Sequence, residues 1–172
     1  MSDLIGKPFP PDFYFNYVPY DEEDQKNKLS CKLPISFKLS QENLKGKKIV
    51  ITSAPGAFTP TCTLSHIPGY VAKAKEFADK GVDKVFVITR DLPFVGAAWG
   101  KLLGQKPPLE FASDPSAKFS QSMGWTKDGG DNGVLTGRYV IVVVDGIVTY
   151  AAEEPDASKV TVSGAANVLS KL

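Results

Sequence analysis

The chain has 172 residues, of which 42% are hydrophobic, and its 20 basic and 19 acidic side chains leave a formal net charge of +1. A chain of this length can bury a core without disulfide or metal staples, and we expect a single domain over residues 1–172. The small net charge argues against a nucleic-acid-binding or membrane-surface protein, since both classes need a basic excess.

The possible classes of protein are restricted further by membrane-span and signal-peptide patterns and by the number of cysteines. No apolar run reaches the length of about 20 residues that a transmembrane helix needs. Residues 1–6 lack the basic and apolar regions of a signal peptide, so we expect a soluble intracellular protein. The two cysteines, Cys31 and Cys62, are too few for a secreted disulfide framework and are typical of a catalytic or redox-sensing pair. Neither lies in a C-x-x-C motif, which argues against a dithiol reductase.

The N-terminal part predicts a strand followed by a loop. Residues 14–18 are aromatic and apolar and favour a strand, whereas residues 20–33 indicate an exposed loop. We interpret the acidic run from 21 to 24 in that loop as a solvated surface. Cys31 lies in the same loop beside Lys32, and exposure next to a cation suits a thiol that takes part in exchange. An accidental surface cysteine is the alternative.

Apolar periodicity and turn residues predict the remaining elements. Strands are expected at 35–39, 48–52, 84–89, 109–112, 139–144 and 147–152. A helix is expected between Cys62 and Gly81, with a kink at Pro68 and a buried face formed by Ile67, Val71, Ala74 and Ala78. Further helices are expected at 94–103, 115–123 and 163–172, and a long loop at 124–137. This order indicates an α/β, thioredoxin-like fold, with a central mixed sheet flanked by helices and an N-terminal strand extension.

The loop after the 48–52 strand is the most informative stretch, and it reads P-G-A-F-T-P-T-C from Pro55 to Cys62. Thr59 is a suitable N-cap, and Pro60 fits the first position of a helix. Cys62 then falls in the first helical turn, where unpaired backbone N–H groups and the helix dipole stabilise a thiolate over a thiol. On position alone, a reactive cysteine and a buried, inert structural cysteine both remain open.

The octapeptide contains P-x-x-x-T-x-x-C, and it resembles the signature of the peroxiredoxins. The continuation H-I-P-G-Y at 66–70 is similar to the peroxiredoxin-5, or type II, branch. Further motifs occur in that family's order: D-L-P-F at 91–94 with A-W at 98–99, F-A-S-D-P at 111–115, and T-G-R at 136–138. The similarity covers about residues 45–152. With Cys31 and the N-terminal segment included, the chain most resembles the fungal alkyl hydroperoxide reductases and peroxisomal thiol peroxidases.

The resemblance implies a thiol-specific peroxidase that reduces hydrogen peroxide and alkyl hydroperoxides. Cys62 would be the peroxidatic cysteine and would form a sulfenic acid. Thr59 lies on the same turn, so that its hydroxyl can reach the sulfur and a bound peroxide, and Pro55 would shield the pocket from water. Arg138 matches the pocket arginine of the branch; sequence spacing alone does not establish its contact with Cys62.

A sulfenic acid needs a second thiol, and no cysteine follows Cys62 in the chain. An internal resolving cysteine can therefore only be Cys31, and the fungal relatives imply that it acts across a homodimer interface. Thioredoxin is the recycling reductant expected by analogy. Two alternatives remain: a one-cysteine peroxidase that uses glutathione or another external thiol, and a redox-regulated binding or chaperone protein.

Other motifs point to no metal or cofactor. His66 has neither a second histidine nor a further cysteine nearby, so a zinc site is disfavoured and a structural histidine is expected. Residues 96–101 resemble a phosphate loop, but the stretch is too short and lacks the Ser or Thr after the lysine. Phe94 is a candidate for the dimer interface, and core packing is expected for Trp99.

The C-terminal residues Ser170-Lys171-Leu172 form the tripeptide that a peroxisomal import receptor reads. The alternative is that they only complete the last helix, with Leu172 packed on the core. We expect import into the peroxisomal matrix, with a cytoplasmic pool as a further location.

Overall fold

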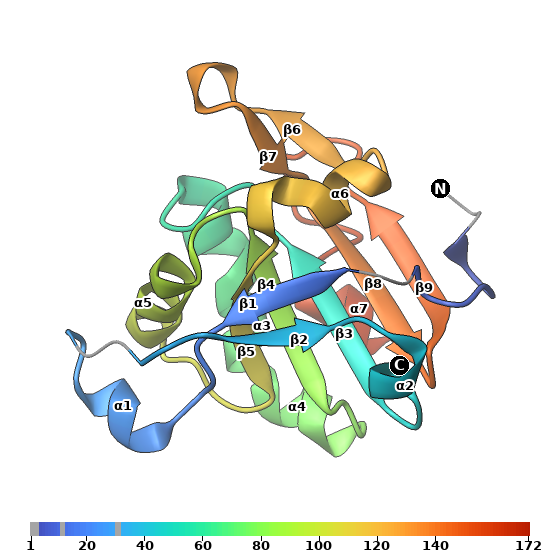
Figure 1. Cartoon of the computed structure of the whole chain (residues 1–172), viewed down its shortest axis with the longest axis horizontal. Coiled ribbons are helices and arrows are strands. Elements are labelled where there is room, and N and C mark those ends of the chain that lie inside the picture. The colour runs from blue at the N-terminus through green and yellow to red at the C-terminus, as the bar shows by residue number, and fades with distance from the viewer. Residues whose placement is uncertain (1–3, 11–12, 30–31) are drawn as a thin grey trace.

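The computed structural model describes residues 4–10, 13–29 and 32–172. A seven-stranded sheet runs through it in the order β2-β1-β5-β4-β3-β8-β9 (Figure 1). These strands are β1 Tyr14–Tyr17, β2 Ile35–Lys38, β3 Lys48–Ser53, β4 Lys84–Thr89, β5 Leu109–Ser113, β8 Tyr139–Val144 and β9 Ile147–Glu153. β3, β4 and β5 are parallel, and β8 is antiparallel to β3. The predicted α/β fold with a mixed sheet and an N-terminal strand extension is confirmed.

Helices flank the sheet. They are α1 Glu22–Lys26, α2 Gln41–Leu44, α3 Ile67–Ala72, α4 Ala74–Asp79, α5 Pro93–Leu103, α6 Lys118–Ser122 and α7 Ala165–Leu169, with a π-helical turn at Cys62–His66 and 3-10 turns at Pro115–Ala117 and Gly130–Asn132. The last helix is shorter than the predicted 163–172. The predicted helix at 115–123 divides into a 3-10 turn and α6, because Ser116 and Ala117 have positive φ angles of 57° and 54°.

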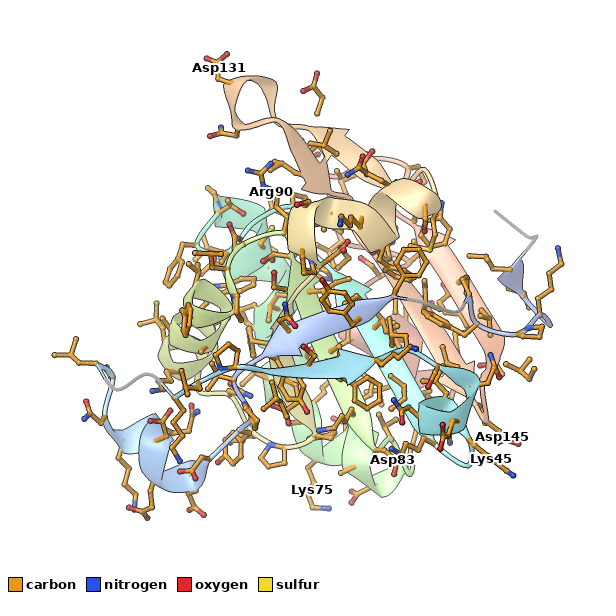
Figure 2. All side chains as sticks on the ribbon, in the orientation of Figure 1. Lys45, Lys75, Asp83, Arg90, Asp131 and Asp145 are labelled. Atoms are coloured by element: carbon orange, nitrogen blue, oxygen red, sulfur yellow. The ribbon has the colours of Figure 1, made fainter. Side chains whose placement is uncertain are left out.

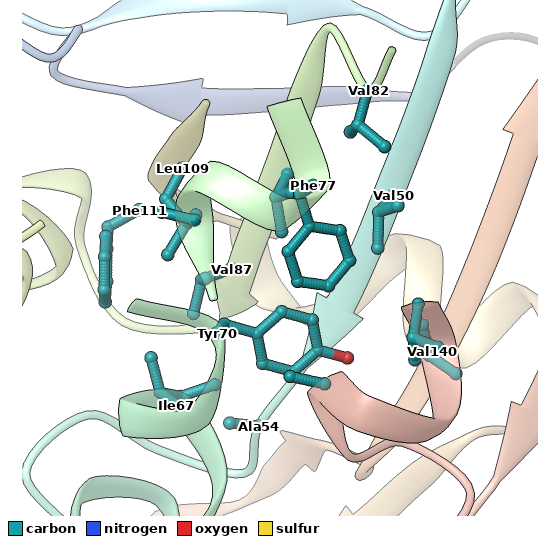
Figure 3. Packing of buried hydrophobic residues seen from close by; sticks show 14 of the residues in the cluster. Val50, Ala54, Ile67, Tyr70, Phe77, Val82, Val87, Leu109, Phe111 and Val140 are labelled. Atoms are coloured by element: carbon teal, nitrogen blue, oxygen red, sulfur yellow. The ribbon is translucent and has the colours of Figure 1, made fainter. Parts of the chain in front are cut away.

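The central strands are buried on both faces, which explains their continuous apolar sequences. Val50 of β3 packs beneath α3 and α4, while its neighbours Ile49 and Ile51 face the opposite layer. In Figure 3 the rings of Tyr70 and Phe77 lie together above the sheet, and these rings stack with their centroids 5.4 Å apart.

The opposite layer contains several packed aromatic rings. Phe15 of β1 meets Phe86 of β4 and Phe119 of α6 edge to face, with ring centroids 5.7 and 5.5 Å apart. The two layers therefore pack on both faces of β3 and β4. The carboxyl ends of these strands lead into the loops at residues 54–59 and 90–92.

The helix after Cys62 differs in detail from its prediction. Its first turn is π-helical, and Ile67 N donates to Cys62 O. This irregularity lies immediately before Pro68, which has no N–H to continue a regular ladder, so the predicted kink is confirmed. A second break at Lys73 separates α3 from α4. Because of it, Phe77 rather than the predicted Ala78 faces the core.

Two segments predicted as loops contain regular structure. The acidic run forms α1, and the prediction of a fully solvated surface is wrong for Asp24. Its carboxylate lies 2.7 Å from Lys101 Nζ, and the two side chains are only 5% and 4% exposed. A buried carboxylate requires such a partner.

The stretch 124–137, also predicted as a loop, contains a two-stranded hairpin of β6 Thr126–Asp128 and β7 Val134–Thr136. Figure 1 shows this hairpin projecting beyond the upper edge of the main sheet. It stands beside the carboxyl ends of the parallel strands, where the candidate site lies.

Candidate active site

The loop between β3 and the following helix sets the position of Cys62. Thr59 O accepts the first helical hydrogen bond, from Thr63 N at 2.9 Å, so the helix begins where the sequence predicts. The side chain of Thr59 does not cap the helix. Its Oγ1 instead donates to Gly56 O at 2.8 Å, across the turn that precedes it. Phe58, between them, has a φ of 60°, which is unusual for a residue with a side chain.

The antiparallel pairing of β8 with β3 brings Arg138 to Cys62. Tyr139, the first residue of β8, lies opposite Ser53, the last residue of β3. Arg138 therefore stands beside the loop that follows β3. Its Nη2 donates to Cys62 Sγ at 3.4 Å, a contact that sequence spacing could not establish.

The guanidinium of Arg138 is held on three sides. Nε donates to Ala157 O at 2.8 Å, and Nη1 lies 2.9 Å from His66 Nδ1. Arg138 is 2% exposed and Cys62 is 1% exposed. A buried cation with fixed hydrogen bonds is therefore in contact with the sulfur, where it can stabilise negative charge in the reaction.

His66 takes part in the site through its neutral form. Its Nε2 lies 3.2 Å from Ser163 O, which can only accept, so this nitrogen carries the proton. Arginine can only donate, so Nδ1 is the bare nitrogen that accepts from Arg138. Burial, and then the nearby Arg138 charge, lower the pKa of His66 from 6.5 to about 4. The ring is thus a neutral acceptor that orients the arginine.

A buried carboxylate supports this arrangement from behind. Ser163 O also accepts from Tyr70 Oη at 2.6 Å, and Ser163 N and Oγ both donate to Glu154 at 2.8 Å. Burial alone would raise the pKa of Glu154, but hydrogen bonds from Thr161 and Ser163 lower it, so the group is a carboxylate. The chain Glu154, Ser163, His66 and Arg138 forms what we call the buried wall.

Through Arg138, the buried wall borders a cleft of about 420 Å³. All four predicted site residues with described positions line this cleft: Pro55, Thr59, Cys62 and Arg138. The other lining residues are Gly56, Ala57, Pro60, Thr61, Arg90, Asp91, Lys127, Asn132, Leu135 and Ala157. Pro55 is buried, as its predicted shielding role requires, and Thr59 is exposed.

Sequence reasoning assigned His66 a structural role and passed over Arg90 and Lys127. A signal for His66 existed, because it stands four residues after Cys62 and so returns to a similar face of the helix. For Lys127, nothing in the sequence places the 124–137 stretch at the cleft. For Arg90 a signal existed, because it directly follows the predicted strand at 84–89, and neighbouring parallel strands end at the same edge of a sheet.

Cys31 lies outside the described residues, so its predicted role stays a prediction. One ion pair joins the segment that precedes it to α5, and a second ion pair links residues on either side of it. Lys32 Nζ lies 2.7 Å from Asp21 Oδ2, and Asp24 forms the buried ion pair with Lys101 of α5.

Among the residues that the structure describes, no group of three or more His, Cys, Asp or Glu side chains could hold a metal ion. Over the same residues, every helix is too short or too polar to cross a membrane.

A thioredoxin-like sheet and a buried cysteine hydrogen-bonded to an arginine together define a thiol-based redox protein. The family model described as Redoxin matches residues 5–169. The chain is 40% identical to peroxiredoxin Pen c 3 of Penicillium citrinum over the full length of both, and 41% identical to a putative peroxisomal peroxiredoxin of Lipomyces kononenkoae over 95% of this chain and 98% of that one.

Comparison with solved structures points to the same class of protein. Reduced Prx3 of Vibrio vulnificus in complex with hydrogen peroxide is 27% identical, with a TM-score of 0.79 over 98% of each chain. The chain therefore belongs to the peroxiredoxin family. It is a thiol peroxidase with a peroxidatic cysteine.

Proposed function

We propose that Cys62 is the peroxidatic cysteine and that Arg138, Thr59 and Pro55 form its pocket. The observation that carries this assignment is the 3.4 Å contact between Arg138 Nη2 and Cys62 Sγ at the wall of an open cleft. An inert structural cysteine needs neither a buried cation nor access to solvent. Reactive cysteines typically lie beside a positive group and border a site that a substrate can enter.

The reaction follows from this geometry. The thiolate of Cys62 attacks the hydroxyl-bearing oxygen of the peroxide, so that an S–O bond forms while the O–O bond breaks. The sulfur is oxidised to a sulfenic acid and the peroxide is reduced. The leaving alkoxide or hydroxide takes a proton from water. Arg138 stabilises the negative charge as it moves from sulfur to the leaving oxygen.

Thr59 fits the role of a peroxide acceptor. Because its Oγ1 already donates to Gly56 O, its lone pairs are left to accept the O–H of the peroxide. This refines the predicted role, in which the hydroxyl reaches both sulfur and peroxide. The hydrogen bond to Gly56 fixes the direction of the hydroxyl, and a fixed acceptor aligns the O–O bond for attack.

For the second half of the cycle we propose that Cys31 resolves the sulfenic acid across a homodimer interface. The disulfide forms with loss of water, and a dithiol such as thioredoxin reduces it. The exposed Phe94 and its neighbour Leu92, 42% and 67% exposed, are apolar surface suited to that interface. A one-cysteine cycle with glutathione is the alternative.

Peroxisomal import is the location we propose. Ser170 and Lys171 of the C-terminal tripeptide are exposed, and the Lipomyces relative carries a peroxisomal name. Leu172 packs in part against the core, so both predicted uses of this residue remain compatible.

Substitution of Thr59 separates a peroxidase from a redox-regulated binding protein. Thr59→Val removes the acceptor while keeping the shape, and Thr59→Ser keeps the hydroxyl. We expect Thr59→Val to slow oxidation of Cys62 by hydrogen peroxide about 100-fold, because the substrate loses its fixed partner. Thr59→Ser should retain most of the rate. Stopped-flow oxidation of the reduced protein measures both, with circular dichroism as the check on folding. Equal rates in wild type and Thr59→Val would reject this role.

A further inference from the structure

Two cations line the cleft in addition to Arg138, the arginine that contacts the reacting sulfur. Arg90 follows β4, and Lys127 belongs to the first strand of the β6–β7 hairpin; both line the cleft together with Cys62. We call this pair the cationic rim. The only arginine besides Arg90 is Arg138, which is committed to Cys62 and His66.

The charges around the cleft are unbalanced. Arg90, Lys127 and Arg138 line it with a single carboxylate, Asp91. Among the described residues, none of these three cations has a carboxylate within ion-pair distance. Asp91 Oδ2 accepts from Ala57 N at 2.8 Å, so this carboxylate is hydrogen-bonded to the loop that follows β3. Even with Cys62 as a thiolate, positive charge remains in excess.

The acidic residues of the hairpin are not part of the cleft lining. Asp128 Oδ1 accepts from Gly130 N at 2.8 Å in the hairpin turn, and neither Asp128 nor Asp131 lines the cleft. Figure 2 shows Asp131 at the outer tip of the hairpin, with Arg90 below it where the hairpin meets the body.

Arg90 has a fixed place with donors to spare. Its Nη1 donates to Val134 O at 2.9 Å, which ties the hairpin to the loop after β4. A guanidinium has five N–H donors, so this single bond leaves others for a ligand. Lys127 is exposed on the opposite strand of the hairpin and adds a mobile point charge.

The size of the cleft argues for a substrate larger than hydrogen peroxide. Its volume of about 420 Å³ is many times the roughly 30 Å³ that a water molecule occupies. Apolar groups of Ala57, Pro60, Leu135 and Ala157 line the same cleft. The cleft thus combines the reacting thiol, an apolar stretch formed by these four residues, and an excess of positive charge.

From these features we propose that the cationic rim selects organic hydroperoxides that bear a carboxylate away from the peroxy group. The hydrocarbon part packs on the apolar stretch, the peroxy group meets Cys62, and the carboxylate meets Arg90 and Lys127. This inference rests on the proposed function of Cys62 and deepens it by naming the class of substrate.

A pair of synthetic peroxides isolates the carboxylate. Para-carboxy cumene hydroperoxide and its methyl ester share the reacting group and differ in charge. The measurement is the second-order rate constant for oxidation of the reduced full-length protein by each, followed by stopped flow. We expect the acid to react at least about fivefold faster than the ester at low ionic strength, because the rim attracts the anion. The preference should shrink as salt is added.

Variants test whether the rim is responsible. Lys127→Met should lower the ratio of acid to ester, Lys127→Glu should invert it, and the double variant Arg90→Met, Lys127→Met should bring it to one. Lys127 is exposed, so its substitutions spare the fold even if Arg90→Met does not. Lys45→Met is the matched control, since Figure 2 places Lys45 far from Arg90 at the other end of the molecule; it should keep the wild-type ratio.

Equal rates for acid and ester in the wild type would overturn the inference, as would a preference that survives in the double variant. In both cases rapid oxidation by the ester would leave the peroxidatic role of Cys62 intact. If neither the two organic peroxides nor hydrogen peroxide oxidised Cys62, the proposed function and the inference would fall together.

Discussion

The two sides of the cleft differ in how deeply their charged side chains are buried and in how many hydrogen bonds hold them. The buried wall holds Arg138 at 2% exposure, with three hydrogen bonds and a neutral histidine behind it. In the cationic rim, Lys127 is exposed on a short hairpin, and Arg90, in the loop after β4, is half-buried and has one anchoring bond, to Val134 O. The charge of Arg138, which stabilises the transition state, is fixed and desolvated. The charges of the cationic rim, which would bind different substrates, stay hydrated.

The same contrast appears in the strands that carry the two sides. Arg138 of the buried wall directly precedes β8, whose pairing with β3 extends over six residue pairs between the two layers of the core. The hairpin is held by three residue pairs and does not join the main sheet. Substitutions in the wall should therefore change the rate for every peroxide, and substitutions in the rim should change the order of preference among peroxides.

The largest effect that this comparison predicts is for Arg138. Arg138→Met removes the cation in contact with Cys62 Sγ, and we expect oxidation of Cys62 by hydrogen peroxide to slow by about 100-fold or more. Arg138→Lys keeps a charge but not the planar fork, and it should recover only part of the rate. Stopped-flow oxidation of the reduced protein measures each variant.

The chain contains one other arginine, which supplies the matched comparison. Arg90→Met removes the same side chain from the rim, and its loss of rate with hydrogen peroxide should be far smaller than that of Arg138→Met. Similar losses in the two variants would contradict the division between wall and rim.

A smaller effect is expected from His66, and it depends on pH. In the folded protein the pKa of His66 is lowered to about 4, so the unfolded chain takes up a proton below pH 6.5 while the folded chain resists it. The unfolding free energy therefore falls as the pH decreases from about 6.5 to about 4, and the contribution of His66 is on the order of 3 kcal/mol. Above pH 6.5 this contribution is fully present.

His66→Asn is the variant that tests this dependence. Its amide oxygen retains an acceptor for Arg138 but does not titrate. Urea unfolding of wild type and variant at a series of pH values should give stabilities that converge, or change order, as the pH falls from 6.5 to 4. Parallel profiles over that window would mean that the folded state does not hold His66 neutral.

Much of the fold could be predicted from local sequence, but the contacts that assemble the site could not. The strands β3, β4 and β8 are apolar runs that match their predicted ranges to within a residue, since burial on both faces leaves an unmistakable pattern. The loop with Pro55, Thr59 and Cys62 was also predictable, because proline and threonine specify a helix start.

The remainder depends on partners distant in the chain. Asp24 looks like any surface acid until Lys101 is placed beside it, and the hairpin strands are too short and glycine-rich to give a clear alternation. The contact of Arg138 with Cys62 follows only from the antiparallel pairing of β8 with β3. The family resemblance implied that contact, and the register explains it.

The central claim is that Cys62 attacks the peroxide and that Cys31 of a second chain completes the cycle. The most direct measurement is non-reducing electrophoresis, with mass spectrometry of the same samples, of wild type, Cys31→Ser and Cys62→Ser after one equivalent of tert-butyl hydroperoxide. A covalent dimer in the wild type, absent from both variants, with a sulfenic acid on Cys62 in Cys31→Ser, is the predicted result. An unmodified Cys62 in a wild-type protein that still consumes peroxide would contradict the account.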